Sequence, residues 1–252
     1  MDLVTRKMNA ARRRFGFTLI ELLMVISIIS LLVAILLPSL GAARRRATEM
    51  QCKANLRSLG QGVAAYAADS KDYMPINARS SYWFFYFLKS QAYANKPINL
   101  GMLYANGYIT THKPFFCPMQ KAENWTYKPD TWWKNNGEVA GFTGNTTGGY
   151  TYWIQDVPHR EKAPTSLDYY IRMTLLGQRA YASDLTFSGT VADGLTNLAH
   201  KNGDAIEINV LSTDASVRVV NNNDNAISNI QHFNNIAKQD ETYTMFDSKL
   251  NK

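Results

Sequence analysis

Residues 17–40 read FTLIELLMVISIISLLVAILLPSL, an apolar run of 24 residues that contains a single charge, Glu21. At about 1.5 Å per residue, a helix of this length crosses a hydrocarbon layer of about 30 Å with some tilt. The run therefore predicts a transmembrane helix near the N-terminus.

The positive charge of the chain is concentrated on the two flanks of this run. Of the formal net charge of +7, the first sixteen residues hold +4, because five basic residues there oppose only Asp2. Residues 44–46 are three arginines, so the chain beyond them is nearly neutral. A nucleic-acid-binding surface is therefore not expected. The larger basic cluster precedes the run, which favours a cytoplasmic N-terminus.

Helical character continues beyond Pro38 and Gly41. Apolar residues then recur at steps of four and three, a spacing that places them on one face of a helix: Cys52, Leu56, Leu59, Val63 and Tyr66. Stop signals follow between Asp69 and Pro75. These patterns predict a leader at 1–16, a transmembrane helix at 17–40, an amphipathic extension at 41–70 and a globular head at 71–252.

The predicted head consists of short aromatic and β-branched runs separated by Gly, Pro and Asn, a pattern typical of strands in an antiparallel sheet. The clearest strands are at 82–88, 149–154, 180–185, 205–211 and 215–220. The expected fold is α+β, with one long N-terminal helix packed on a small antiparallel sheet.

Arg12 to Glu21, RRRFGFTLIE, resembles the processing site of type IV prepilins and type II secretion pseudopilins. The resemblance implies a pilin-like fold and a structural, non-enzymatic subunit of a pilus-like or secretion-like filament. A membrane prepilin peptidase would cut between Gly16 and Phe17 and methylate the new amine of Phe17. Glu21 would pair with the amine of a neighbouring subunit. Other pilin-like subunits and an inner-membrane assembly platform would be the further partners, with the head outside the cytoplasm.

A secretory signal peptide and a plain single-pass anchor are the alternatives to a prepilin N-terminus. A signal peptide could be cleaved near Gly41, Ala42 and Ala43, but the apolar run exceeds the usual 7–15 residues of a signal core. Three arginines also follow that position directly. A plain anchor would not require the sequence from Gly16 to Glu21. Both alternatives are therefore weaker than the prepilin interpretation.

The head resembles, in patches, a pseudopilin-like group of planctomycete and lentisphaeral bacteria. The similar patches are Cys52-Lys53-Ala54-Asn55-Leu56, Phe116-Cys117-Pro118, Ala182-Ser183-Asp184 and a late motif that runs from His200 to Asp214. Members of that group usually carry Asp-Gly where this chain has Asp214-Ala215. Because alanine adopts a positive φ less easily than glycine, we expect a different turn type here. We expect His200 and Asp214 to fix this turn.

The two cysteines, Cys52 and Cys117, lie neither in a CxxC pair nor near a histidine at metal-ligand spacing, so no metal site is expected. In an oxidising compartment they could form a disulfide, and otherwise they would be two buried thiols.

Enzymatic or ligand-binding roles of the head find little support. The four histidines are scattered and no catalytic motif is present, so an enzyme is not expected. No cofactor is expected either, and calcium is a minor alternative, with Asp184, Asp193, Asp204 and Asp214 as oxygen donors. Aromatic residues could form a carbohydrate-binding adhesive surface, although packing in the core explains them more simply; they are Trp83, Phe84, Tyr86, Trp132, Trp133, Tyr152 and Trp153.

Overall fold

A computed structural model describes residues 17–76, 87–90, 96–120, 146–152, 161–162, 169–184, 200–202, 205–221 and 244–250. The chain divides into two compact units, Met1–Arg46 and Ala47–Lys252, which are described here one at a time. The predicted boundaries at residues 16, 40 and 70 stay predictions.

One long helix, α1, runs from Leu19 to Asp69 and passes through Pro38 without ending. Proline lacks the N–H that a helix interior normally uses, but the flanking turns remain helical. The helix ends where Lys71 and Asp72 adopt positive φ values of 55° and 74°. There the N–H of Asp72 donates to the carbonyl of Ala67 at 2.7 Å, which closes the last turn.

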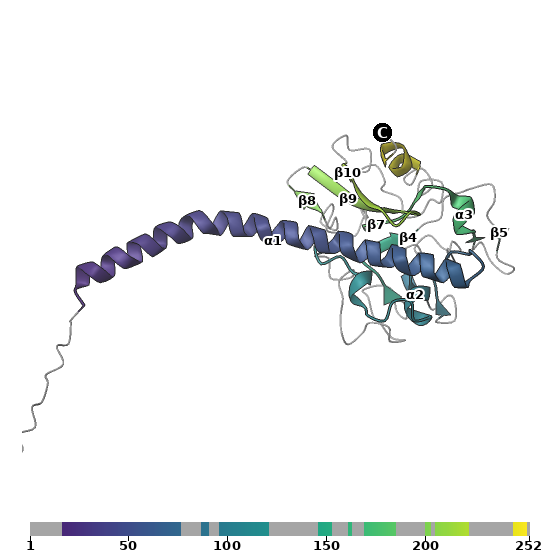
Figure 1. Ribbon diagram of the computed structural model, residues 1–252, viewed down its shortest axis with the longest axis horizontal. Coiled ribbons are helices and arrows are strands. Elements are labelled where there is room, and N and C mark those ends of the chain that lie inside the picture. Colours follow the sequence, from purple (N-terminus) through teal and green to yellow (C-terminus); the bar gives the residue numbers. More distant parts are fainter. Residues whose placement is uncertain are drawn as a thin grey trace, which may run out of the picture. The chain divides into compact units, whose positions relative to one another are not determined.

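The head contains short strands and helices (Figure 1). The strands are β1 (Phe87–Ser90), β2 (Lys96–Pro97), β3 (Thr146–Thr147), β4 (Tyr150–Tyr152), β5 (Glu161–Lys162), β6 (Tyr169–Tyr170), β7 (Ala180–Asp184), β8 (Lys201–Asn202), β9 (Ala205–Ser212) and β10 (Val217–Asn221). The short helices are α2 (Gly101–Ala105), the 3-10 helix η3 (Lys113–Phe115) and α3 (Met173–Leu176), and residues 244–250 are also helical.

The main sheet has the strand order β10-β9-β7-β4, with β8 paired to β9, and all of its pairs are antiparallel. A second antiparallel sheet has the order β2-β1-β3, and β5 pairs with β6 alone. The expected α+β fold, a long helix with a small antiparallel sheet, is confirmed. Its layout is pilin-like.

The part of α1 beyond Arg46 packs between the main sheet and the α2 region (Figure 1). Four residues of the predicted stripe, Cys52, Leu56, Leu59 and Val63, have no exposed surface. The fifth, Tyr66, is partly buried against the same core. Two glycines in the same stretch allow close approach. A Cβ on Gly60 would lie 2.8 Å from Leu211 Cδ1 of β9, and a Cβ on Gly62 would lie 3.1 Å from the side chain of Ile109.

The turn between β9 and β10 corrects one expectation. Ala215 adopts φ 58°, in the left-handed region, and its N–H donates to the Ser212 carbonyl at 2.9 Å. The Ser212 N–H in turn donates to the Ser216 carbonyl at 3.0 Å. This is the three-residue hairpin with a left-handed third residue that glycine usually occupies. The alanine therefore adopts the positive φ that we expected it to avoid, because the surrounding hydrogen bonds hold it in this conformation.

Candidate functional site

The predicted cleavage site lies at the start of the described chain. Gly16 is outside the described residues, and Phe17 is the first residue described, with 70% of its surface exposed. Thr18 follows, immediately before α1 begins. An exposed Phe17 next to the helix start is compatible with access by a peptidase.

Glu21 has partners within its own chain. Its Oε2 accepts hydrogen bonds from the backbone N–H of Thr18 at 2.9 Å and from the Thr18 hydroxyl at 2.8 Å. The N–H of Glu21 points back to Thr18 Oγ1 at 3.3 Å. This reciprocal arrangement is a capping box, which satisfies N–H groups that the first helical turn leaves unpaired. The spacing Thr-x-x-Glu is the sequence signal that could have predicted it, whereas the expected pairing of Glu21 involved only another subunit.

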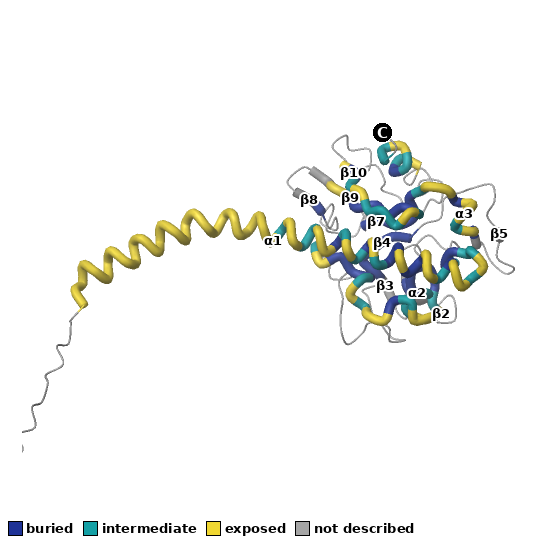
Figure 2. The backbone as a smooth tube through the Cα atoms, viewed as in Figure 1, coloured by how far each residue is buried: buried dark blue, intermediate teal, exposed yellow. Residues whose placement is uncertain are grey.

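The first half of α1 has an apolar surface that nothing in the described chain covers. The most apolar window of the helix has a mean hydropathy of 2.9 and none of it is buried (Figure 2). Ser27 and Ser30, the polar residues of its centre, donate their hydroxyls to carbonyls one turn earlier at 2.7 Å. A helix of this length and composition suits a membrane or a bundle of like helices.

Cys52 and Cys117 meet in the head, where a disulfide joins them with a Cα–Cα distance of 5.0 Å. Both residues are buried. The Asn55 side chain joins the same two segments, because it donates to the Phe116 carbonyl at 2.9 Å. The Tyr150 hydroxyl of β4 donates to the Cys52 carbonyl at 3.2 Å and so links α1 to the sheet. The oxidation state of the exported protein stays a prediction, tested below.

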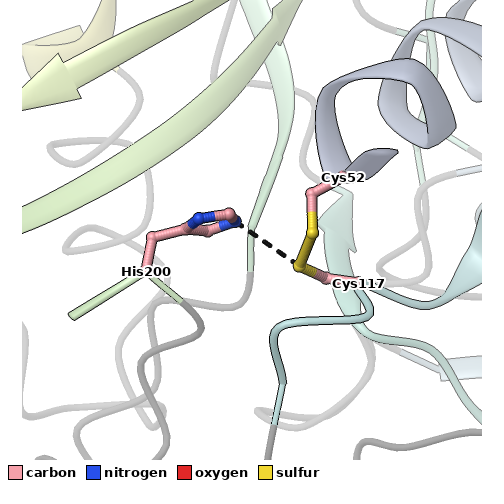
Figure 3. A group of neighbouring side chains, drawn as sticks. All are labelled: Cys52, Cys117 and His200. Carbon is pink, nitrogen blue, oxygen red and sulfur yellow. Dashed lines mark hydrogen bonds between the residues drawn. A yellow bond between two sulfur atoms is a disulfide. The ribbon is translucent and has the colours of Figure 1, made fainter. Parts of the chain in front are cut away.

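His200 lies against this disulfide, with its ring directed toward Cys117 (Figure 3). Three groups converge on one ring nitrogen, Nε2: Cys117 Sγ at 3.4 Å, Asp184 Oδ2 at 3.2 Å and the Asn209 side-chain amide at 3.0 Å. Asp184 Oδ2 also accepts the backbone N–H of Asn209 at 2.7 Å. The cluster joins the end of β7, the middle of β9 and the loop after η3.

The electrostatics of this cluster favour a protonated imidazole. Burial by itself lowers the pKa of His200, but the hydrogen bond and the negative charge of Asp184 outweigh it, with smaller contributions from Glu49 and Glu207. The net effect is a pKa of His200 above its ordinary value. Asp184 Oδ1 is buried and has no hydrogen-bond partner among the described residues.

The late His–Asp motif separates into two places. Asp214 stabilises the hairpin turn as expected, because its Oδ1 accepts the Ser216 N–H at 2.9 Å and its Oδ2 accepts the Gln178 amide at 3.1 Å. His200 contacts the Cys117 and Asp184 cluster instead. Of the other candidate calcium ligands, Asp193 and Asp204 lie outside the described residues.

The aromatic surface considered for an adhesive head lies almost entirely outside the described residues. Tyr152 is the exception, and it has no exposed surface. Its hydroxyl donates to the Pro75 carbonyl at 2.6 Å. Tyr152 therefore packs in the core, and nothing in the described part of the chain favours an adhesin.

Comparison with known proteins places the resemblance at the N-terminus. Residues 11–37 match the family described as the prokaryotic N-terminal methylation motif. The chain is also 45% identical over 62 residues to the type IV wide pilus major component PilA4 of Thermus thermophilus. That match covers 25% of this chain and 47% of the pilin, so the chain spans about half the length of this relative. No solved structure matches the chain.

The motif coincides with the capping box and with the start of the uncovered apolar helix, and the fold behind it is a long helix on an antiparallel sheet. The chain therefore carries the N-terminal methylation motif of type IV pilin-like proteins on a pilin-like α+β fold.

Proposed function

We propose that this chain is a structural subunit of a type IV pilus-like or type II secretion-like filament. The observation that carries the proposal is the position of the methylation motif, directly before an apolar helix that the rest of the described chain leaves uncovered. In the membrane such a helix anchors the subunit, and in a filament like helices from other copies cover it. The subunit has a structural role, without catalysis.

Processing at Gly16 lies between the membrane-anchored form and the filament form of the subunit. Removal of the basic leader by a prepilin peptidase leaves Phe17 as the new N-terminus, and methylation keeps its amine basic. Glycine before the cut offers no side chain to obstruct an extended peptide in the peptidase. The larger positive charge of the leader, together with the resemblance to prepilins, supports a cytoplasmic N-terminus and a head outside the cytoplasm, where a disulfide is stable.

Glu21 would then guide assembly. A carboxylate in the middle of a bilayer costs about 2.5–3.5 kcal/mol on insertion scales, and less near the interface. The capping box reduces that cost in the isolated subunit by satisfying the carboxylate locally. The positive amine of a neighbouring Phe17 offers a stronger, charged partner. Exchange of the Thr18 bonds for this pairing would set the axial offset between subunits on the assembly platform.

Terminal sequencing of the protein isolated from its native membrane tests the proposal. The expected mature chain begins at Phe17 and carries a methylated α-amine. A chain that begins after Ala43 would indicate an ordinary signal peptide. A chain that retains Met1 would indicate a plain anchor, and either result would reject the prepilin interpretation.

A further inference from the structure

A buried group of potential metal ligands lies where the long helix meets the sheet. Cys52 Sγ, Cys117 Sγ and a ring nitrogen of His200 all lie within 4.8 Å of one another, and all three residues are buried (Figure 3). The sequence did not suggest this group, because the three residues come from α1, from the loop after η3 and from the residue before β8. Their separations along the chain match no zinc motif.

We infer that the dithiol form of this chain binds one Zn²⁺ through Cys52, Cys117 and His200, with the carboxylate of Asp184, which lies beside His200, moving in as the fourth ligand. Two thiolates, an imidazole and a carboxylate are ligands that zinc accepts in a four-coordinate tetrahedral site. The two thiolate charges balance the charge of the ion. The disulfide and the zinc ion use the same two sulfur atoms, so the two forms exclude each other.

The distances around His200 Nε2 are close to those of a tetrahedral site. With zinc–sulfur bonds of about 2.3 Å and zinc–nitrogen bonds of about 2.0 Å, sulfur and nitrogen ligands lie about 3.5 Å apart. Nitrogen and oxygen ligands lie about 3.3 Å apart by the same geometry. The structure has Cys117 Sγ at 3.4 Å and Asp184 Oδ2 at 3.2 Å from Nε2. The two sulfurs must separate to about 3.8 Å when their bond is reduced. Asp184 must also move closer to them, because among the described residues only Cys52, Cys117 and His200 have ligand atoms within 4.8 Å of one another.

The polar groups of the cluster support a cation at this point. Asp184 Oδ1 is buried without a hydrogen-bond partner among the described residues, although buried polar atoms are usually paired. Three groups also crowd one nitrogen, where a single proton cannot satisfy them all. A zinc ion among them would bond to sulfur, nitrogen and carboxylate oxygen at once.

The exchange between the two forms balances in electrons and protons. A thiol or phosphine reductant delivers two electrons and two protons to the disulfide, which gives two thiols. Binding of Zn²⁺ then displaces both thiol protons and the Nε2 proton of His200, because thiolates and a neutral imidazole are the ligands. A disulfide oxidant reverses the sequence by removing two electrons from the sulfurs, and the zinc ion is released.

Cobalt titration of the full chain in detergent tests this inference. The chain is reduced with a phosphine under anaerobic conditions and titrated with Co²⁺, which reports tetrahedral geometry and thiolate ligation in its absorption spectrum. We expect one Co²⁺ per chain with both signatures, displaced by one equivalent of Zn²⁺, and no such spectrum from the oxidised chain. A six-coordinate spectrum without thiolate charge transfer would overturn the inference.

Variants and a labelling experiment complete the test. His200→Gln should lower the affinity for Zn²⁺ at least about 100-fold, since loss of an outer-shell partner already costs 10–100-fold. His112→Gln, a histidine variant elsewhere in the head, should leave it unchanged. If His200→Gln does not fold, thiol alkylation of the reduced wild-type chain decides: Zn²⁺ should protect both cysteines. Equal alkylation with and without Zn²⁺ would overturn the inference, as would unchanged affinity in folded His200→Gln.

Discussion

Reduction of the disulfide between Cys52 and Cys117 should destabilise the head strongly. The two residues are 65 positions apart. In the chain-entropy model, a crosslink that closes a loop of this length lowers the entropy of the unfolded chain and so stabilises the folded head by about 4 kcal/mol. For a head of about 200 residues, each kcal/mol shifts Tm by about 2–4 °C. We therefore expect reduction to lower Tm by about 8–16 °C.

The assay is thermal unfolding of the full chain in detergent, followed by near-UV circular dichroism with and without a phosphine reductant. A metal chelator is present in both samples, so that zinc cannot replace the disulfide. The matched control is the Cys52→Ser, Cys117→Ser double variant, whose Tm should not respond to the reductant. A decrease of less than about 2 °C in the wild-type chain would refute the reasoning, as would two free thiols in exported protein under non-reducing mass analysis.

Three further predictions concern assembly and packing. Glu21→Ala should insert into membranes at least as well as the wild type but give fewer crosslinked subunits, because it loses the charge that pairs with a neighbouring amine. Gly60→Ala should destabilise the head by about 1 kcal/mol in denaturant unfolding, since crowding against Leu211 costs about 1–3 kcal/mol and helix propensity returns about 1. Tyr152→Phe should cost about 1–2 kcal/mol by the same measurement, because a buried carbonyl loses its donor.

Each of these predictions has a control in the same chain. Thr18→Val removes the cap but keeps the Glu21 charge, so crosslinking should persist; loss of crosslinking there would assign the effect to the helix start. A Cβ at Gly41 would meet no atom within 4 Å, so Gly41→Ala should not destabilise the head. Tyr108→Phe loses an exposed bond to Asp69 and should cost less than about 0.5 kcal/mol. The role given to burial would be contradicted if Gly41→Ala destabilised the head as much as Gly60→Ala. It would also be contradicted if Tyr108→Phe cost as much as Tyr152→Phe.

Features that depend on local patterns could be predicted without coordinates. The apolar run predicted the long helix, the steps of four and three predicted which face of α1 is buried, and the short runs predicted β4, β7, β9 and β10 to within a few residues. The methylation motif is likewise contiguous, so it could be recognised from the residues alone. Each of these signals lies within about one helix or one hairpin, where spacing along the chain fixes spacing in space.

Contacts between distant residues became known only from the folded chain. The strand order places β7 between β4 and β9, and this order brings Asp184 and Asn209 to His200 beside Cys117. It also holds Ala215 in a conformation that local preference opposes, because the hydrogen bonds of the hairpin outweigh a strain of about 1–2 kcal/mol. Such contacts depend on the pairing of strands that are far apart in the sequence and on the fit of Gly60 against β9. The spacing of residues along the sequence predicts neither.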